Sequence, residues 1–140
     1  MREILFRGKR IDNGEWVEGC LTLLDKTVTF AEITYQHEWE EGKFYIVRAE
    51  VEPDTVGQYT GLTDTNGKMI FEGDIIKSWQ GKILAVKFGQ YHDDEEVIPG
   101  NGWYVSGEYG TLSFDERWGG HEIIGNIHDN PDFDLRGAGA

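Results

Sequence analysis

The feature that most constrains the fold is the stretch from Val56 to Ile76, which holds a tight reversal and the start of a strand. Asp64-Thr65-Asn66-Gly67 has the composition of a β-turn, because Asp and Asn hydrogen-bond their own backbone and Asn-Gly supplies the positive φ angles of a tight hairpin. Gly73 and Asp74 then precede Ile75-Ile76, where a glycine lets the backbone bend into a β-branched, apolar strand. The stretch predicts a bent sheet, and it contains no obvious nucleophile, metal ligand or phosphate-binding loop.

A second Asn-Gly pair, Asn13-Gly14, predicts another tight hairpin near the start of the chain. Alternating apolar residues, many of them β-branched or aromatic, predict further strands. The expected strands of the first half are residues 2–7, 16–24, 27–33 and 44–51. The polar segment 35–42 is expected to form a loop. In the second strand, the face that contains Val17 should point into the core, and Cys20 on the other face should be a half-buried filler.

The second half has the same Gly-punctuated organisation. Its expected elements are hairpins at 75–88 and 103–114 and a final strand at 121–128. Residues 83–88 are almost continuously apolar, which indicates a central strand covered on both faces, and 89–102 is expected to be the least regular segment. These patterns predict a mainly β fold, with small, strongly bent antiparallel sheets in a partly open, SH3-like barrel and minor helical content.

The length of 140 residues suits one domain that buries roughly two-thirds of its unfolded surface. Pro53 holds the residue before it in an extended conformation and marks the best internal boundary. We therefore expect a single β domain. Its parts are an N-terminal lobe at 1–53 and a C-terminal lobe at 54–136, followed by a disordered tail at 137–140.

The formal net charge of −13 lies mostly in the second half. Residues 1–50 have 7 basic and 10 acidic side chains, whereas residues 51–140 have 6 and 16. Nonspecific nucleic-acid binding depends on neutralising phosphates with Lys and Arg, so direct binding to DNA or RNA is not expected. Arg7, Lys9 and Arg10 form either a local basic patch or, as we favour, a solvated strand end. An acidic face would suit a basic partner protein, although it also promotes solubility.

The segment from Tyr91 to Glu96 contains four consecutive carboxylates beside His92. Divalent cations take several oxygen ligands, but adjacent residues seldom converge on one ion, and EF-hand spacing is absent. We favour a solvated acidic loop that faces a partner, and we expect no cofactor. Trp39 and Trp118, in charged or Gly-rich segments, are candidates for the same exposed role. The predicted interaction surface consists of Trp39, Tyr91, Asp93, Asp94, Glu95, Glu96 and Trp118.

The sequence shows no recognisable set of catalytic residues. The four His residues are scattered without metal-ligand spacing, and Cys20 has no paired His. His37, among acids and aromatics, would need convergent partners from elsewhere to bind a metal or act as a base. A non-enzymatic role is favoured over an enzymatic one.

The sequence also bears on the compartment. No run of about 18 apolar residues occurs, so no membrane partner is expected, and the first apolar segment breaks after three residues, so no signal peptide is expected. A single Cys cannot form an intramolecular disulfide. We expect a cytoplasmic location.

Five segments spread over nearly the whole chain share one family resemblance. They are Arg2–Arg7, Gln58–Leu62, Asp64–Lys68, Ile70–Ile76 and Ile123–Pro131. Together they resemble the YopX-like family of bacteriophages and prophages. The resemblance implies a phage-derived, mostly β protein with a YopX-like barrel and no established biochemical role, and it brings no catalytic residues. The structural signature consists of Tyr59, Gly61, Asn66, Gly67, Gly73 and Asp74.

The resemblance and the composition lead to one favoured function and one alternative. The favoured function is a phage or prophage accessory protein, a non-catalytic β module that binds another protein through a strand edge, an acidic loop or exposed aromatics. Open strand edges pair readily, so self-association is a further expectation. The alternative is a role in phage nucleic-acid metabolism or regulation, either by binding DNA or RNA or by acting on a nucleic-acid-binding host protein.

Overall fold

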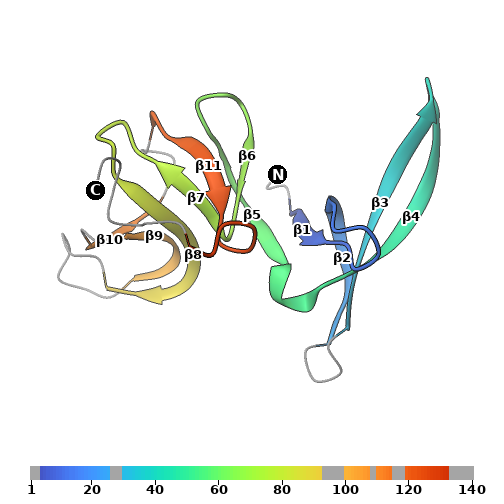
Figure 1. Cartoon of the computed structure of the whole chain (residues 1–140), viewed down its shortest axis with the longest axis horizontal. Coiled ribbons are helices and arrows are strands. Elements are labelled where there is room, and N and C mark those ends of the chain that lie inside the picture. Colours follow the sequence, from blue (N-terminus) through green and yellow to red (C-terminus); the bar gives the residue numbers. More distant parts are fainter. Residues whose placement is uncertain (1–3, 26–29, 93–99, 108–109, 115–118, 133–140) are drawn as a thin grey trace. The chain divides into compact units, whose positions relative to one another are not determined.

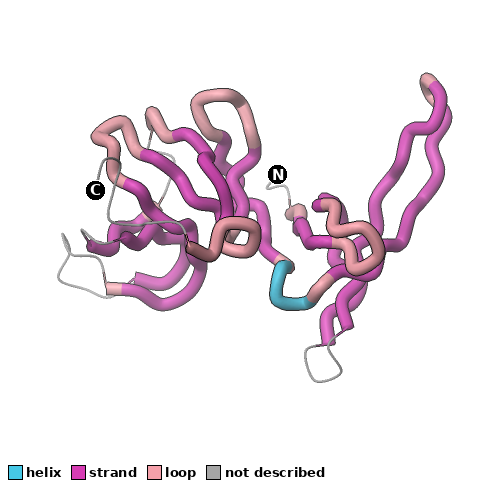
Figure 2. Tube along the Cα trace, in the orientation of Figure 1, coloured by secondary structure: helices cyan, strands magenta, loops and turns pink. Residues whose placement is uncertain are grey.

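The computed structural model of the chain describes residues 4–25, 30–92, 100–107, 110–114 and 119–132. The chain divides into two compact units, Met1–Tyr59 and Thr60–Ala140. Strands account for most of both, and the helical segment among the described residues is the short turn η1 (Pro53–Thr55) (Figure 2). That the two units act as one domain with a disordered tail stays a prediction, and the tail lies outside the described residues.

The first unit is a curved antiparallel sheet. Its strands are β1 (Phe6–Lys9), β2 (Trp16–Asp25), β3 (Phe30–Glu40), β4 (Lys43–Val51) and the start of β5 (Gly57–Thr63). Their hydrogen-bonded order is β4-β3-β2-β1-β5. The predicted Asn13-Gly14 turn joins β1 to β2: the Asn13 side chain accepts a hydrogen bond from the backbone N–H of Glu15, and Gly14 has a φ of 72°.

The core of the first unit lies on one face of this sheet. It consists of Val17, Ala31, Ile33, Ala49 and Val51, with Phe6, Leu21, Tyr35 and Val56 packed against it. β1 approaches the core so closely that a Cβ on Gly8 would lie 2.8 Å from Val51, which leaves no space for a side chain there. The predicted inward face of β2 is confirmed at Val17, whereas Cys20 is exposed and not half-buried.

The second unit contains the end of β5 and six further strands. They are β6 (Met69–Phe71), β7 (Asp74–Lys77), β8 (Ile83–Tyr91), β9 (Gly100–Gly107), β10 (Gly110–Ser113) and β11 (Glu122–Asn126). β5 pairs with β6, and the others form a five-stranded sheet in the order β10-β9-β8-β7-β11. The predicted β7–β8 and β9–β10 hairpins are confirmed.

The core of the second unit is built around β8. Its buried residues are Ile70, Ile76, Leu84, Val86, Val105 and Phe114. β8 lies between β7 and β9, and residues 83–86 are buried without interruption, so the prediction of a central strand covered on both faces is confirmed for these four residues, whereas Lys87 and Phe88 are exposed.

The mainly β, antiparallel fold predicted from the sequence is confirmed, and in the described part of the chain neither sheet closes into a barrel. The SH3-like geometry stays a prediction. The loop expected at 35–42 was wrong: β3 continues to Glu40, and β4 begins at Lys43. β8 and β9 likewise extend into the segment 89–102 that was expected to be irregular. Cross-strand pairing overrides the polar composition in both places.

Candidate functional site

The outer half of the β3–β4 hairpin extends beyond the rest of its sheet. The described pairing of β2 with β3 runs from Cys20↔Thr34 to Asp25↔Phe30, whereas β3 and β4 remain paired as far as Glu40↔Lys43. Residues 36–46 therefore form a two-stranded ribbon at the end of the β3–β4 hairpin (Figure 1). All of them are exposed. A two-stranded hairpin is marginally stable by itself, so the ribbon depends on the sheet at its base.

The two faces of this ribbon differ in their relation to the core. Cross-strand partners lie on the same face of a sheet, so the register assigns each pair to one face. One face continues from the buried pair Ile33↔Ala49, through the half-buried pair Tyr35↔Val47, to the exposed pair His37↔Tyr45. The opposite face has Gln36↔Ile46 and Glu38↔Phe44. Apolar side chains are thus exposed on both faces.

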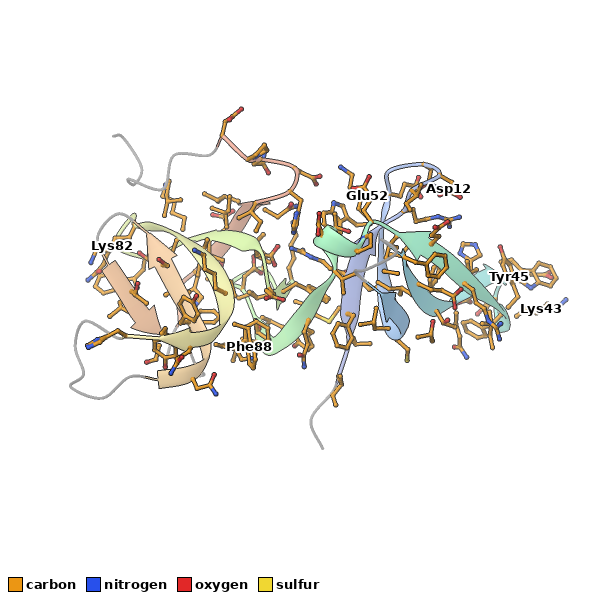
Figure 3. All side chains as sticks on the ribbon, turned by 90° about the horizontal axis from the view of Figure 1, so that it is seen from below. Asp12, Lys43, Tyr45, Glu52, Lys82 and Phe88 are labelled. Atoms are coloured by element: carbon orange, nitrogen blue, oxygen red, sulfur yellow. The ribbon has the colours of Figure 1, made fainter. Side chains whose placement is uncertain are left out.

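The tip of the ribbon is organised by ring and charge contacts. The His37 and Tyr45 rings lie 5.2 Å apart at 50°. The ammonium group of Lys43 lies 5.2 Å from the Trp39 ring and 2.9 Å from a carboxylate oxygen of Glu40. Figure 3 shows Lys43 and Tyr45 at the end of the hairpin. Such exposed contacts orient side chains but contribute little to stability.

A β-bulge lies at Trp39, because Glu38 pairs with Phe44 whereas Glu40 pairs with Lys43. A bulge bends its strand and changes the direction of a side chain, and bulges are common at sheet edges and functional sites. Glu41 follows at the turn, where Gly42 has a φ of 75°. The tip therefore presents an aromatic side chain among three exposed carboxylates.

Of the predicted interaction surface, the structure describes only Trp39 and Tyr91. Trp39 is 57% exposed, at the bulge. Tyr91 is half-buried: its ring stacks on Tyr104 at 4.9 Å and occupies the space where Gly100 would have a Cβ. Asp93, Asp94, Glu95, Glu96 and Trp118 lie outside the described residues. Trp39 thus lies in the first unit and Tyr91 in the second.

Sequence reasoning missed most of the ribbon. Phe44, Tyr45 and Ile46 were assigned to a strand, but nothing marked them as exposed, and they are 53%, 50% and 66% exposed. One signal in the sequence could have indicated this exposure. The apolar run 44–47 follows the polar segment 36–41, so a hairpin of the two would pair apolar residues with polar ones. Trp79, in the β7–β8 turn, is 76% exposed and was also missed.

The basic cluster near the end of β1 is engaged by neighbouring side chains. Arg10 donates to both carboxylate oxygens of Asp12, at 2.8 and 2.6 Å, and to the Tyr35 hydroxyl at 3.1 Å. The hydrogen bonds with Asp12 raise the pKa of Arg10 and lower that of Asp12. The Arg7 guanidinium lies 4.8 Å from the Trp16 ring. Two of the three cations are thus oriented by the protein itself, which weakens the case for a phosphate-binding patch.

The signature segment has a structural centre at Asp64. One carboxylate oxygen accepts the backbone N–H groups of Asn66 and Lys68, both at 2.9 Å, and the other accepts the N–H of Ile123 at 3.1 Å. Burial would raise the pKa of Asp64, but these hydrogen bonds outweigh it and lower the pKa. Asp64 therefore fastens the β5–β6 turn to β11.

The other signature residues are placed around this turn and the next one. Gly61, Gly67 and Gly73 have φ angles of 89°, 79° and 92°, which glycine adopts without strain. Buried Asp74 accepts the N–H of Phe71 at 2.8 Å, and Tyr59 is buried, whereas Asn66 is exposed.

His121 is buried beside Asp64 and close to Phe114, with ring centroids 5.3 Å apart. Burial lowers the pKa of His121 because it disfavours the charged imidazolium, and the negative charge of Asp64 offsets this effect in part. The backbone carbonyl of His121 accepts the N–H of Thr65 at 2.9 Å. Its backbone thus contacts the same turn that Asp64 holds.

The described residues also bear on metal binding and on membrane insertion. No group of three or more His, Cys, Asp or Glu side chains among them is arranged to hold a metal ion. In the same residues, no helix has the length and apolar character needed to cross a bilayer.

The chain also matches one protein family. The family model described as YopX protein aligns with residues 5–133 and so covers almost the whole chain, including the ribbon and the Asp64 turn. No curated protein matches the chain.

Proposed function

The chain belongs to the YopX family, and on this premise we propose that it is a non-catalytic protein-binding β module of phage or prophage origin. Its contact surface is the β3–β4 ribbon, residues 36–46. The single observation that supports the proposal is the exposure of Trp39, Phe44, Tyr45 and Ile46 at half or more of their surface. Apolar side chains gathered on one exposed element are typical of interaction sites, whereas single exposed ones are ordinary.

The charge of the ribbon favours a basic partner. Glu38, Glu40 and Glu41 are exposed beside Trp39 and Tyr45, and the ribbon has Lys43 as its only lysine or arginine. Lysine and arginine side chains interact favourably with both carboxylates and aromatic faces. A segment of a basic protein, such as a nucleic-acid-binding protein of the bacterial cytoplasm, could therefore contact both the carboxylates and the aromatic side chains of the ribbon.

The alternative of direct nucleic-acid binding has less support. A net charge of −13 repels phosphate backbones, and the Arg10 guanidinium is already paired with Asp12. Labelled single-stranded DNA and RNA in low salt test this alternative. Binding that weakens steeply as salt rises would favour it over the protein-binding role.

The decisive experiment compares captures from a bacterial lysate by three forms of the full chain. These are the wild type, the double variant Trp39→Ala/Tyr45→Ala, and Trp79→Ala, which removes an even more exposed aromatic side chain elsewhere in the chain. We expect basic proteins retained by the wild type and by Trp79→Ala but not by the double variant. Identical captures by all three forms would rule out the ribbon as the contact surface.

A further inference from the structure

β4 ends its sheet, and its outer side is covered at one end only. The N–H of Ile11 donates to the carbonyl of Glu50 at 3.1 Å, and the N–H of Glu52 donates to the carbonyl of Lys9 at 2.9 Å. Along 44–47, the described strands pair with β4 only on its β3 side. The same strand edge is therefore covered at its base and open in the ribbon.

The bonds at the base identify which backbone groups point outward at the tip. Backbone N–H and C=O groups alternate between the two sides of an antiparallel strand. The backbone carbonyl of Glu50 and the backbone N–H of Glu52 point away from β3. The register of β4 with β3 is regular from Val51 back to Phe44. The outward groups in the ribbon therefore belong to Phe44 and Ile46. Such an open edge is a template for another strand.

This edge has the opposite charge to the chain that bears it. Residues 43–49 include Lys43 and Arg48 and no acid, although the net charge of the chain is −13. A second copy is repelled least where two such segments meet, because the nearest carboxylates across the hairpin, those of Glu38 and Glu40, lie on β3 and not on this edge, and Glu40 is paired with Lys43. A two-fold contact also uses the same patch on both copies, which requires a sequence that complements itself.

We infer that β4 pairs antiparallel with β4 of a second copy, about a two-fold axis at Tyr45. In this register Phe44 lies opposite Ile46 of the second copy, so the outward N–H and C=O groups of both residues find partners. The pair is aromatic against β-branched, which is favourable across strands. Lys43 lies opposite Val47, so no like charges face each other. The inference rests on the proposed function in taking the ribbon as a contact surface.

The expected dimer is weak. Each exposed side chain on this edge offers roughly 100 Å², so Phe44, Tyr45 and Ile46 in both copies supply at most on the order of 600 Å². Stable complexes bury about 1,200 Å² or more in total, so micromolar dissociation is expected even with the added backbone pairing. Edge pairing leaves both faces of the four resulting ribbon strands available to a basic protein.

Sedimentation of the purified full chain, over roughly 5–500 μM, tests self-association without any other protein. Ile46→Pro removes an outward N–H without removing a bond to β3, and proline is tolerated at such edge positions. We expect at least about a tenfold rise in the dimer dissociation constant. Ile46→Val keeps the N–H and the branched side chain and should dimerise like the wild type. Circular dichroism verifies that both variants fold.

Cysteine substitution tests the register independently of Ile46→Pro. In a Cys20→Ser background, Tyr45→Cys should form an intermolecular disulfide on mild oxidation, because a residue on the axis faces itself at about 4.5 Å between Cα atoms. Val47→Cys is the control, since two copies of this position would lie about 13 Å apart. Both substitutions replace one side chain on the same face of β4, so they differ mainly in distance from the axis.

Each outcome decides the inference. Concentration-dependent dimers that cross-link at position 45 and not at 47 would support it. A monomer at every concentration, or a dimer that Ile46→Pro leaves unchanged, would overturn it. A monomeric chain that still captures basic proteins through the ribbon would overturn the dimer while leaving the proposed function intact. Dimerisation without ribbon-dependent capture would do the reverse.

Discussion

The base and the tip of the β3–β4 hairpin are made of similar residues in different surroundings. At the base, Ile33 and Val51 are completely buried in the core of the first unit. At the tip, Ile46 and Tyr45 on β4 of the same hairpin have half or more of their surface exposed. The difference is that β2 pairs with β3 at the base, whereas at the tip β3 and β4 pair only with each other among the described strands. Residues at the base stabilise the fold, whereas residues at the tip remain available for contacts outside the chain.

The largest expected effect is at the base. Ile33→Ala removes a fully buried side chain and should lower the free energy of unfolding by about 2–5 kcal/mol, since such a change loses burial and leaves a cavity. Urea unfolding followed by circular dichroism measures it. Ile46→Ala is the matched control at the tip, where about 0.5 kcal/mol or less is expected. Similar losses in both variants would contradict the distinction between base and tip.

A second prediction compares the unanchored tip with the anchored β5–β6 turn. Asp64→Asn keeps the shape of the side chain but replaces the charged carboxylate, whose two oxygens accept three backbone N–H groups. The free energy of unfolding should fall by about 2–3 kcal/mol. Thermal unfolding measures the change. Glu38→Gln is the control, because Glu38 accepts the Gly42 N–H at 3.2 Å, in the described part of the chain, at an exposed site. An unchanged midpoint for Asp64→Asn would mean that the turn does not depend on this anchor.

The pH dependence should follow the anchored turn and not the tip. Folding lowers the pKa of His121 from 6.5 and that of Asp64 from 3.8. The unfolded state therefore takes up protons first as the pH falls, so stability is lost below about 6.5 through His121 and further below about 4 through Asp64. Urea midpoints between pH 8 and pH 3 measure both steps. His121→Gln should flatten the upper step alone, and a midpoint independent of pH would contradict the assignment.

The smallest effect on stability is expected from the aromatic residues of the tip. Trp39→Ala and Tyr45→Ala should each change the free energy of unfolding by about 0.5 kcal/mol or less, because both side chains are at least half exposed. The same variants are expected to lose partner binding. A large drop in the urea midpoint would show that the tip supports the fold, and it would then be a poor candidate for a binding surface.

Some of the site could be predicted from the sequence, for local reasons. Trp39 was selected because it lies among charged residues, and the two Asn-Gly turns were recognised by the φ angles that they require. The polar residues of segment 35–42 lack strand propensity and so predict a loop. The segment is a strand because β4 supplies its hydrogen-bond partners, and β propensity depends strongly on such context.

By itself, the sequence determined the mainly β fold, the positions of several hairpins and the acidic character of the chain. These depend on alternation, turn residues and composition, which are properties of neighbouring positions. Only the tertiary structure decided that Ile33 is buried while Ile46 is exposed, and that Asp64 holds β11. The physical reason is that burial and hydrogen bonding depend on which distant segment packs against a strand. The alternation of residues along one strand does not identify that segment.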